Sequence, residues 1–226
     1  MTLMLRRIVS ALAGVAALVA SAGAAQVALY PTGPAEDSAF LRFVNTTGTA
    51  LTVTADDAQN SIDLAAPSAA TGFQAVPANR AVQGTLVTAS GKTPLSLTVA
   101  PGEFATVVAA SADAGGAPAL HVVREQPDDF NAMRASLALA VADPDCEAAS
   151  LGVAGREVSI FQDVASGSVA RRAINPVRLT VQARCAGQPV GAALDLGELA
   201  PGGRYTVILA PSAQGTLALF ANDQAD

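Results

Sequence analysis

Few side chains of this sequence could do chemistry by themselves. The one histidine, His121, lies in an apolar strand-like run, and a lone histidine cannot supply the several nitrogen or sulfur ligands of a stable zinc site. Asp143, Asp145 and Glu147 are spaced like the opening of a calcium loop, but Ala148 stands where that loop needs a glycine for its bend. We therefore expect a solvated turn at these acidic residues and no metal site.

The sequence also lacks the motifs of nucleophilic catalysis and of phosphate binding. No serine lies in a G-x-S-x-G elbow, and Gly91-Lys92-Thr93 resembles the end of a phosphate-binding loop whose upstream glycine is replaced by Leu86. The sequence therefore predicts no catalytic residue, no cofactor and no enzyme activity. A weak esterase or acetyltransferase is the alternative, and its only imidazole base would be His121.

The N-terminus has the order of a secretory signal peptide. Arg6 and Arg7 precede an apolar stretch that ends in small residues, and this stretch is shorter than a membrane-spanning helix requires. Cleavage after residue 22, 24 or 25 fits this pattern, and we expect the last of these, with Gln26 as the first mature residue of an exported, soluble product. Loss of Arg6 and Arg7 leaves 11 of the 13 basic residues against 19 acidic ones, a formal charge of about −8. Such a charge repels phosphate backbones, so nucleic acid is excluded as a partner.

The chain has two cysteines, Cys146 and Cys185. In the oxidising compartment that an export signal implies, an even number of cysteines indicates a disulfide. We therefore predict a Cys146–Cys185 bond.

Short apolar segments separated by turn residues predict an all-β fold. The clearest strand is 176–185, in which Val177, Leu179 and Val181 alternate with polar residues. Other expected strands are 40–45, 51–55, 95–99, 105–110, 120–124, 136–142, 157–163, 205–210 and 216–221.

An internal repeat predicts that this fold is duplicated. Ala-Pro-Gly at 100–102 with Thr-Val-Val at 106–108 recurs at 200–202 and 206–208, where the last residue is Ile. Pro-Gly favours a type II turn, and we expect each copy to form a hairpin that leads into a core strand.

We therefore expect two tandem antiparallel β-sandwich domains of the immunoglobulin-like or carbohydrate-binding-module-like type. The predicted division is a signal peptide at 1–25, a first domain at 26–124, a linker at 125–131 and a second domain at 132–226. The linker is polar, acidic and interrupted by a proline.

The supply of aromatic and basic side chains bears on which partners the chain could bind. With no Trp and two Tyr residues, the chain has little aromatic surface for stacking on sugars. The better candidates for binding a partner are Arg171, Arg172 and Arg178, because guanidinium groups suit carboxylates on uronic acids or on proteins. An ordinary solvated loop before a strand is the alternative interpretation.

Three segments of the sequence form a recognisable set: Ala-Leu-Tyr-Pro at 28–31, Phe-Leu-Arg-Phe-Val-Asn at 40–45 and Arg-Ala-Ile-Asn-Pro-Val-Arg at 172–178. Together they resemble the AlgF family of periplasmic proteins that assist alginate O-acetylation. The likeness spans the mature chain, although the cysteine pair and a longer Ala/Ser-rich stretch before Arg171 depart from the family pattern.

The resemblance implies a non-catalytic adaptor for O-acetylation of an exopolysaccharide, either alginate or cellulose. Its implied partners are periplasmic SGNH-type acetyltransferases and a membrane O-acyltransferase. A module that binds the anionic polysaccharide directly is the alternative. The residues predicted to contact partner or polymer are Tyr30, Arg42, Asn45, Arg171, Arg172, Asn175, Pro176 and Arg178.

Overall fold

Alternating apolar and polar side chains make most of this sequence into β-strands. The computed structural model describes residues 38–56, 61–112, 116–126 and 131–223, all within one compact unit, Gly33–Asp226. These ranges contain strands, turns and bends, and none of their residues forms a helix that could span a membrane. The all-β prediction is confirmed for them. The predicted signal peptide, residues 1–25, lies outside the described residues.

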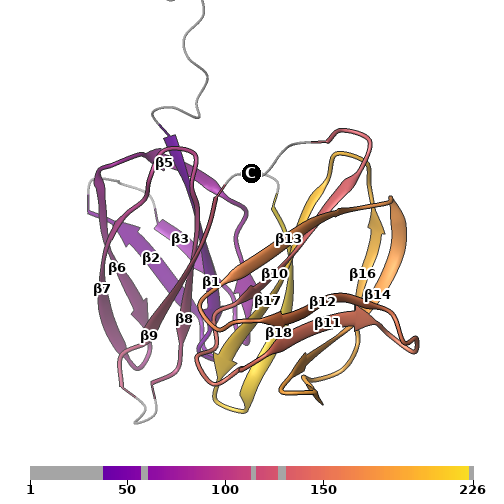
Figure 1. Cartoon of the computed structure of the whole chain (residues 1–226). Helices are drawn as coiled ribbons and strands as arrows, with labels where there is room; N and C mark the ends of the chain where they lie inside the picture. The colour runs from indigo at the N-terminus through magenta and orange to yellow at the C-terminus, as the bar shows by residue number, and fades with distance from the viewer. Residues whose placement is uncertain (1–37, 57–60, 113–115, 127–130, 224–226) are drawn as a thin grey trace, which may run out of the picture. The chain divides into compact units, whose positions relative to one another are not determined.

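The N-terminal half holds two sheets, which we call A and B (Figure 1). Sheet A has the order β4-β1-β8-β9, with β5 also paired to β1, and sheet B has the order β3-β2-β6-β7. The strands are β1 (Ser38–Thr46), β2 (Leu51–Ala55), β3 (Ser61–Leu64), β4 (Ala69–Ala70), β5 (Gln74–Pro77), β6 (Ala81–Thr88), β7 (Gly91–Thr98), β8 (Phe104–Ala110) and β9 (Ala119–Glu125).

The C-terminal half repeats this arrangement with sheets C and D. Sheet C has the order β13-β10-β17-β18, and sheet D has the order β12-β11-β14-β15, with β16 also paired to β14. The strands are β10 (Ala135–Val141), β11 (Ala149–Val153), β12 (Ser159–Val164), β13 (Val169–Ile174), β14 (Val177–Cys185), β15 (Gln188–Pro189), β16 (Leu194–Leu199), β17 (Arg204–Ser212) and β18 (Gly215–Asn222). In both halves the first strand pairs in parallel with the penultimate one, β1 with β8 and β10 with β17.

Three apolar cores hold the sheets together. One lies between sheets A and B, a second between sheets C and D, and a third joins sheet A to sheet C. Leu41 and Phe43 of β1 therefore face sheet B, while Val44 faces sheet C. Burial on both faces is why β1, β8, β10 and β17 are nearly continuous in apolar residues.

The third core bears on the predicted division into domains. Glu125, which the sequence places in the linker, is the last residue of β9, and linker residues 127–130 lie outside the described ranges. Each half has its own pair of sheets, but both halves belong to the same compact unit. The division into two independent domains stays a prediction.

The repeated Ala-Pro-Gly turns have the predicted backbone but a different role. Gly102 and Gly202 have φ angles of 72° and 71°, and the amide of the residue after each glycine donates to Ala100 or Ala200 O. This is the type II geometry expected of Pro-Gly. The hairpin prediction is wrong, because β7 and β8 lie in different sheets, as do β16 and β17. Each turn carries the chain from one layer of a sandwich to the other.

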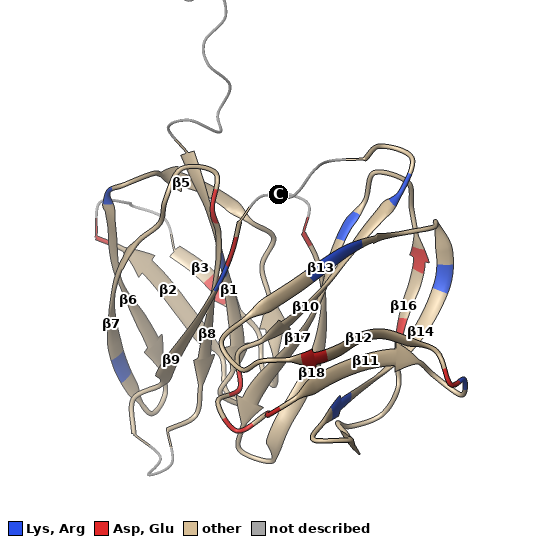
Figure 2. Cartoon of the chain, in the orientation of Figure 1, with Lys and Arg blue, Asp and Glu red and all other residues tan. Residues whose placement is uncertain are grey.

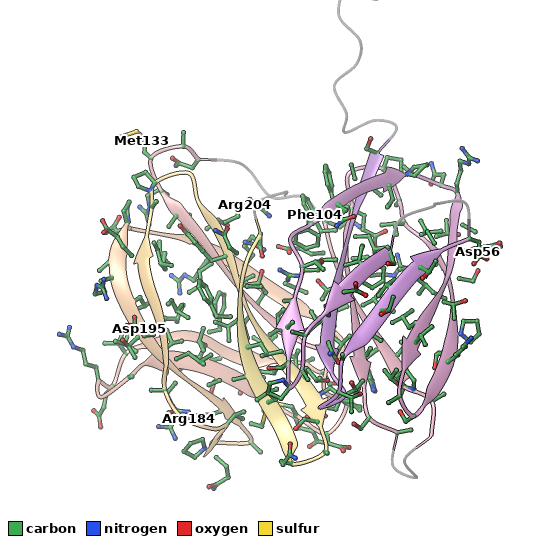
Figure 3. All side chains as sticks on the ribbon, turned by 180° about the vertical axis from the view of Figure 1, so that it is seen from behind. Asp56, Phe104, Met133, Arg184, Asp195 and Arg204 are labelled. Atoms are coloured by element: carbon green, nitrogen blue, oxygen red, sulfur yellow. A yellow bond between two sulfur atoms is a disulfide. The ribbon has the colours of Figure 1, made fainter. Side chains whose placement is uncertain are left out.

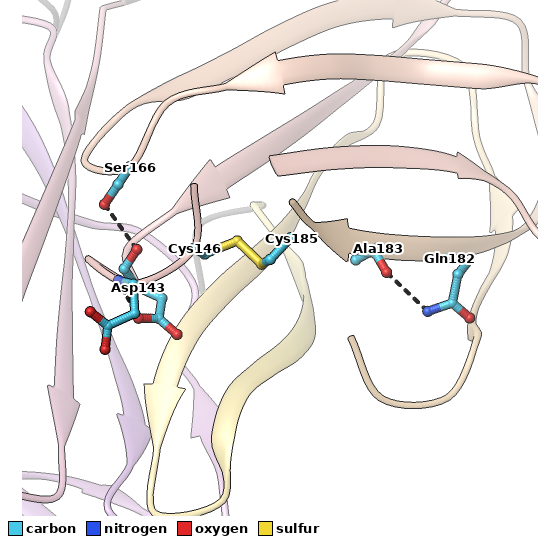
Figure 4. The surroundings of a disulfide bond; sticks show 7 residues. Asp143, Cys146, Ser166, Gln182, Ala183 and Cys185 are labelled. Carbon is cyan, nitrogen blue, oxygen red and sulfur yellow. Dashed lines mark hydrogen bonds between the residues drawn. A yellow bond between two sulfur atoms is a disulfide. The ribbon is translucent and has the colours of Figure 1, made fainter. Parts of the chain in front are cut away.

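A disulfide joins Cys146 to Cys185, as predicted (Figure 4). Cys146 is fully buried, and Cys185 is at the end of β14 against the core between sheets C and D. In the turn that carries Cys146, Asp145 and Glu147 are exposed as expected, but Asp143 is 3% exposed and its Oδ1 accepts from the amide of Asp145 at 3.0 Å. The Asp143 carboxylate fixes this turn and, with it, the position of Cys146.

Replacement of both cysteines by alanine should lower the free energy of unfolding by about 3 to 4 kcal/mol, because the loop between them no longer restricts the unfolded chain. The bonded residues are 39 apart in sequence. Guanidinium unfolding of the oxidised wild type and of the double variant measures the difference. Equal stabilities would show that the bond adds nothing, and reduced wild type is the matched control.

Candidate functional site

The residues predicted to contact a partner separate into a buried and an exposed set. Arg42 is 1% exposed, Asn45 is 0% exposed, and the side chain of Arg171 is 5% exposed. Arg172, Asn175, Pro176 and Arg178 are exposed. Tyr30 lies outside the described residues. Figure 2 shows where the charged residues lie along the strands.

Arg42 extends from the β1 face that meets sheet C. Its Nη1 donates to Asp223 Oδ1 at 2.6 Å, its Nε donates to Thr106 Oγ1 at 2.9 Å, and its guanidinium lies 4.4 Å from the centre of the Phe73 ring. Burial lowers the pKa of Arg42, and the neighbouring Asp223 carboxylate partly offsets this effect. Since an arginine keeps its proton in proteins, this buried charge needs its carboxylate.

Arg171 reaches the same carboxylate from β13. Its Nη2 donates to Asp223 Oδ2 at 2.7 Å, and its Nε and Nη2 form a fork on the two oxygens of Glu125. Burial alone would lower the pKa of Arg171, but the hydrogen bonds and charges of Glu125 and Asp223 outweigh it, so this pKa is raised. The fork is the strong bidentate form of an arginine–carboxylate pair.

Asp223 is the shared acceptor at the centre of this group. Besides the hydrogen bonds from the two guanidinium groups, its carboxylate accepts a hydrogen bond from Thr206 Oγ1, which lies 2.8 Å from each carboxylate oxygen. Two arginines and two acids thus balance to zero formal charge. We call Arg42, Glu125, Arg171, Thr206 and Asp223 the junction network. It joins β1 and β9 of the N-terminal half to β13, β17 and the residue after β18.

Other contacts extend the junction on either side of this network. The guanidinium of Arg204 lies 5.4 Å from the centre of the Phe104 ring in the other half, and both side chains are labelled in Figure 3. Thr46 Oγ1 donates to the carbonyl of Pro211 at 2.7 Å. Between these polar contacts lies the third core, composed of Val44, Val108, Val123, Ala140, Ala142, Ile208, Ala210 and Ala221.

Asn45 shapes the turn after β1. Its Nδ2 donates to Thr49 O at 2.7 Å, and its Oδ1 accepts from the amide of Thr47 at 3.0 Å. Like Arg42 and Arg171, Asn45 has its hydrogen-bond partners inside the protein. The structure therefore gives these three residues partners within the chain, and the contact surface that the sequence analysis predicts reduces to the exposed set.

The exposed set forms the bend between β13 and β14, residues Arg172 to Arg178, which we call the β13–β14 bend. Arg172 Nη1 donates to Ile160 O at 2.9 Å, and Arg178 lies 3.7 Å from Asp195 in a solvent-exposed pair. Val177 between them is 47% exposed although a core position was predicted for it. Met133, which is 79% exposed, precedes Arg134, whose Nη2 donates to Ala173 O at 3.2 Å. Apolar and cationic groups are therefore presented together.

A polar groove of about 660 Å³ lies on sheet D, apart from the bend. Arg156, Gln162 and Asp163 line it from β12 and the preceding turn, and Ser150 and Arg184 line it from β11 and β14. Its volume lies in the range of small-molecule sites. Across the described ranges, no three His, Cys, Asp or Glu side chains are grouped so as to hold a metal ion.

Sequence reasoning missed three members of the junction network. Asp223 follows the last expected strand, Glu125 lies in the expected linker, and Thr206 was noted only as part of the repeat. The repeat was the available signal, because Thr106 and Thr206 occupy the same place in β8 and β17 and both bond this network. The local sequence does not show that Asp223 and Arg42 meet across 181 residues.

Comparisons with known proteins add no family assignment. No protein-family model matches the chain, and no curated protein matches it. The C-terminal domain of AlgF from P. aeruginosa is 20% identical, with a TM-score of 0.34 over 40% of this chain and 98% of that domain. A candidate cell adhesion protein from Bacteroides uniformis is 12% identical, with a TM-score of 0.29 over 82% of this chain and 99% of that one.

A third solved structure is the CBM26-family module of Amy13K from Eubacterium rectale, in complex with maltoheptaose. It is 10% identical, with a TM-score of 0.24 over 83% of this chain and 98% of that module. Because every one of these TM-scores is below 0.5, the likenesses carry no argument about this chain.

Replacement of Asp223 by asparagine should lower the free energy of unfolding by about 3 kcal/mol or more, because two buried guanidinium groups lose their common counter-charge. Asp195→Asn is the control: its carboxylate pairs with Arg178 in solvent, so the change should be within about 0.5 kcal/mol. Urea unfolding followed by circular dichroism measures both variants. Equal losses would contradict the structural role of the junction network.

Proposed function

We propose that this chain is a non-catalytic periplasmic adaptor for the O-acetylation of an exopolysaccharide, with alginate or cellulose as the polymer. It acts by contact with periplasmic SGNH-type acetyltransferases and a membrane O-acyltransferase. The proposal rests on the resemblance of residues 28–31, 40–45 and 172–178 to the AlgF family. The Cys146–Cys185 disulfide fits an oxidising compartment.

The observation that carries the proposal is the exposure of the β13–β14 bend. The third family-like segment, Arg172 to Arg178, is solvent-exposed at six of its seven positions, and Ile174 is half-buried. Arginine and methionine are enriched at protein–protein interfaces, and arginine is among the residues that carry most of the binding energy. The family-like arginine of the second segment, Arg42, is used inside the protein, and this leaves the bend to meet a partner.

Deletion of the gene should abolish acetylation of the polymer while its synthesis continues, because the proposed role concerns the transfer machinery and not the polymerase. Proton NMR of the purified polymer measures acetyl groups per sugar. The wild-type gene should restore them, and normal acetyl content in the deletion strain would refute the role.

The deletion strain also tests whether the β13–β14 bend is the contact surface. Arg172→Ala with Arg178→Ala should restore acetylation poorly and weaken capture of the acetyltransferase about tenfold or more, since truncation of a central contact residue costs at least about 1 to 2 kcal/mol. Both residues are exposed, so thermal stability should hardly change. Lys92→Ala, which removes an exposed cation of β7 outside the bend and the sheet D groove, is the matched control. Unchanged capture by the double variant would remove the bend from the contact.

We propose polysaccharide binding by the sheet D groove as a second candidate function. The supporting observation is a polar groove that carries Arg156 and Arg184, whose guanidinium groups suit uronate carboxylates. Uronate oligosaccharides should then shift NMR signals of residues 150–163 and 184–187 saturably, and Arg156→Ala with Arg184→Ala should abolish the shifts. Shifts confined to the β13–β14 bend, or none, would exclude the groove.

A further inference from the structure

An apolar pocket opens into the core of the N-terminal half, far in sequence from the β13–β14 bend. Its volume is about 200 Å³, and strands of both sheets of the sandwich contribute to its wall. The wall is mainly aliphatic and aromatic, with Leu41, Phe43, Val53, Val76 and Leu95 among its members. Of these, Leu41, Phe43, Val53 and Leu95 are buried core residues. The pocket is therefore an opening in the core itself.

A glycine in β6 explains why this space is open. Val82 and Leu86 both pack against the core between sheets A and B, and Gly84 lies between them on the same face without a side chain. A Cβ at Gly84 would lie 2.5 Å from the carbonyl oxygen of Thr54, so the close approach of β2 requires glycine here. The core consequently lacks a side chain at the middle of β6.

A small residue of β2 faces the same gap. Ala55 of β2 pairs with Gly84 of β6, two residues along from the pair Val53–Leu86. Both Ala55 and Gly84 line the pocket. The pocket therefore lies where one strand has an alanine and its neighbour has no side chain.

The size and lining of the pocket limit what can fill it. Apolar cavities of about 150 Å³ accept benzene, so a pocket of this size holds a group of about six to eight carbons. A polar group inside it would lose its hydrogen bonds to water without replacement. The part of a ligand that enters the pocket is therefore apolar.

The mouth of the pocket adds a polar end to the site. An adjoining hollow of about 350 Å³ shares Ala55, Val76, Val82 and Gln83 with the pocket and is also lined by Asp56 and Arg80. Arg80 is exposed and has no ion-pair partner within the described ranges. With the side-chain amides of Gln74 and Gln83 nearby, donors outnumber the one carboxylate, Asp56. A guanidinium fork in this place suits a carboxylate.

We propose that this pocket binds a free fatty acid of about six to eight carbons, with its chain among Val53, Val76 and Leu95 and its carboxylate beside Arg80. The site uses none of the residues of the β13–β14 bend, so the proposal is independent of the adaptor role. Residues 57–60, between Asp56 and Ile62 in sequence, lie outside the described residues and are no part of it.

Titration of the mature chain, from Gln26, with octanoate tests the proposal. Calorimetry should show saturable binding, and NMR shifts should centre on residues 53–55, 74–76 and 82–84. Acetate should not bind, because it lacks the alkyl chain. Octylammonium should bind about tenfold more weakly than octanoate, because its positive charge repels Arg80. No saturable binding of octanoate, or shifts outside these residues, would overturn the site.

Two variants test separately the contacts of the ligand's alkyl chain and those of its carboxylate. Ala55→Val adds two methyl groups to the wall of the pocket and should weaken octanoate at least about tenfold. Arg80→Gln, at an exposed position, should weaken octanoate and leave octanol unchanged. Lys92→Gln, a cation of β7 outside both hollows, is the control and should bind as wild type does. Wild-type affinity in both Ala55→Val and Arg80→Gln would overturn the proposal, even if either variant alone were destabilised.

Discussion

The arrangement of this molecule depends on one carboxylate that two buried guanidinium groups share. Removing two arginines from water is costly, and their mutual repulsion in a medium of low dielectric adds to the cost. Asp223, with Glu125 on its far side, offsets that cost because each guanidinium has an oxygen within hydrogen-bond distance. Because Arg42 and Glu125 belong to the N-terminal half and Arg171 and Asp223 to the C-terminal half, the Arg42–Asp223 and Arg171–Glu125 pairs form only when the two halves pack together.

The same junction explains the composition of the strands around it. Sheets A and C each pack against a sandwich partner on one face and against each other on the second face. Their central strands therefore need small apolar residues where the sheets meet, and Ala140, Ala210 and Ala221 meet that need. The high alanine content that the sequence displays is partly a requirement of four stacked layers.

Much of the fold could be predicted from local patterns, and the site could not. Short apolar runs between turn residues located β1, β8, β10 and β17, period-2 alternation located β14, and compartment reasoning gave the Cys146–Cys185 bond. The strand β6 was missed because Gly84 interrupts its apolar face, and β13 because Arg171 is polar yet buried. The partners of Arg42 and Arg171 are set by packing between halves, which no window of neighbouring residues encodes.

The distance in sequence between Arg42 and Asp223 also orders events during synthesis. The ribosome adds Arg42 first and Asp223 181 residues later, so for most of that time the guanidinium has no counter-charge to be buried with. An N-terminal sandwich that has formed early must keep the β1 face hydrated, because closing it would strand a cation. Final closure of the layers is thereby tied to completion of the polypeptide.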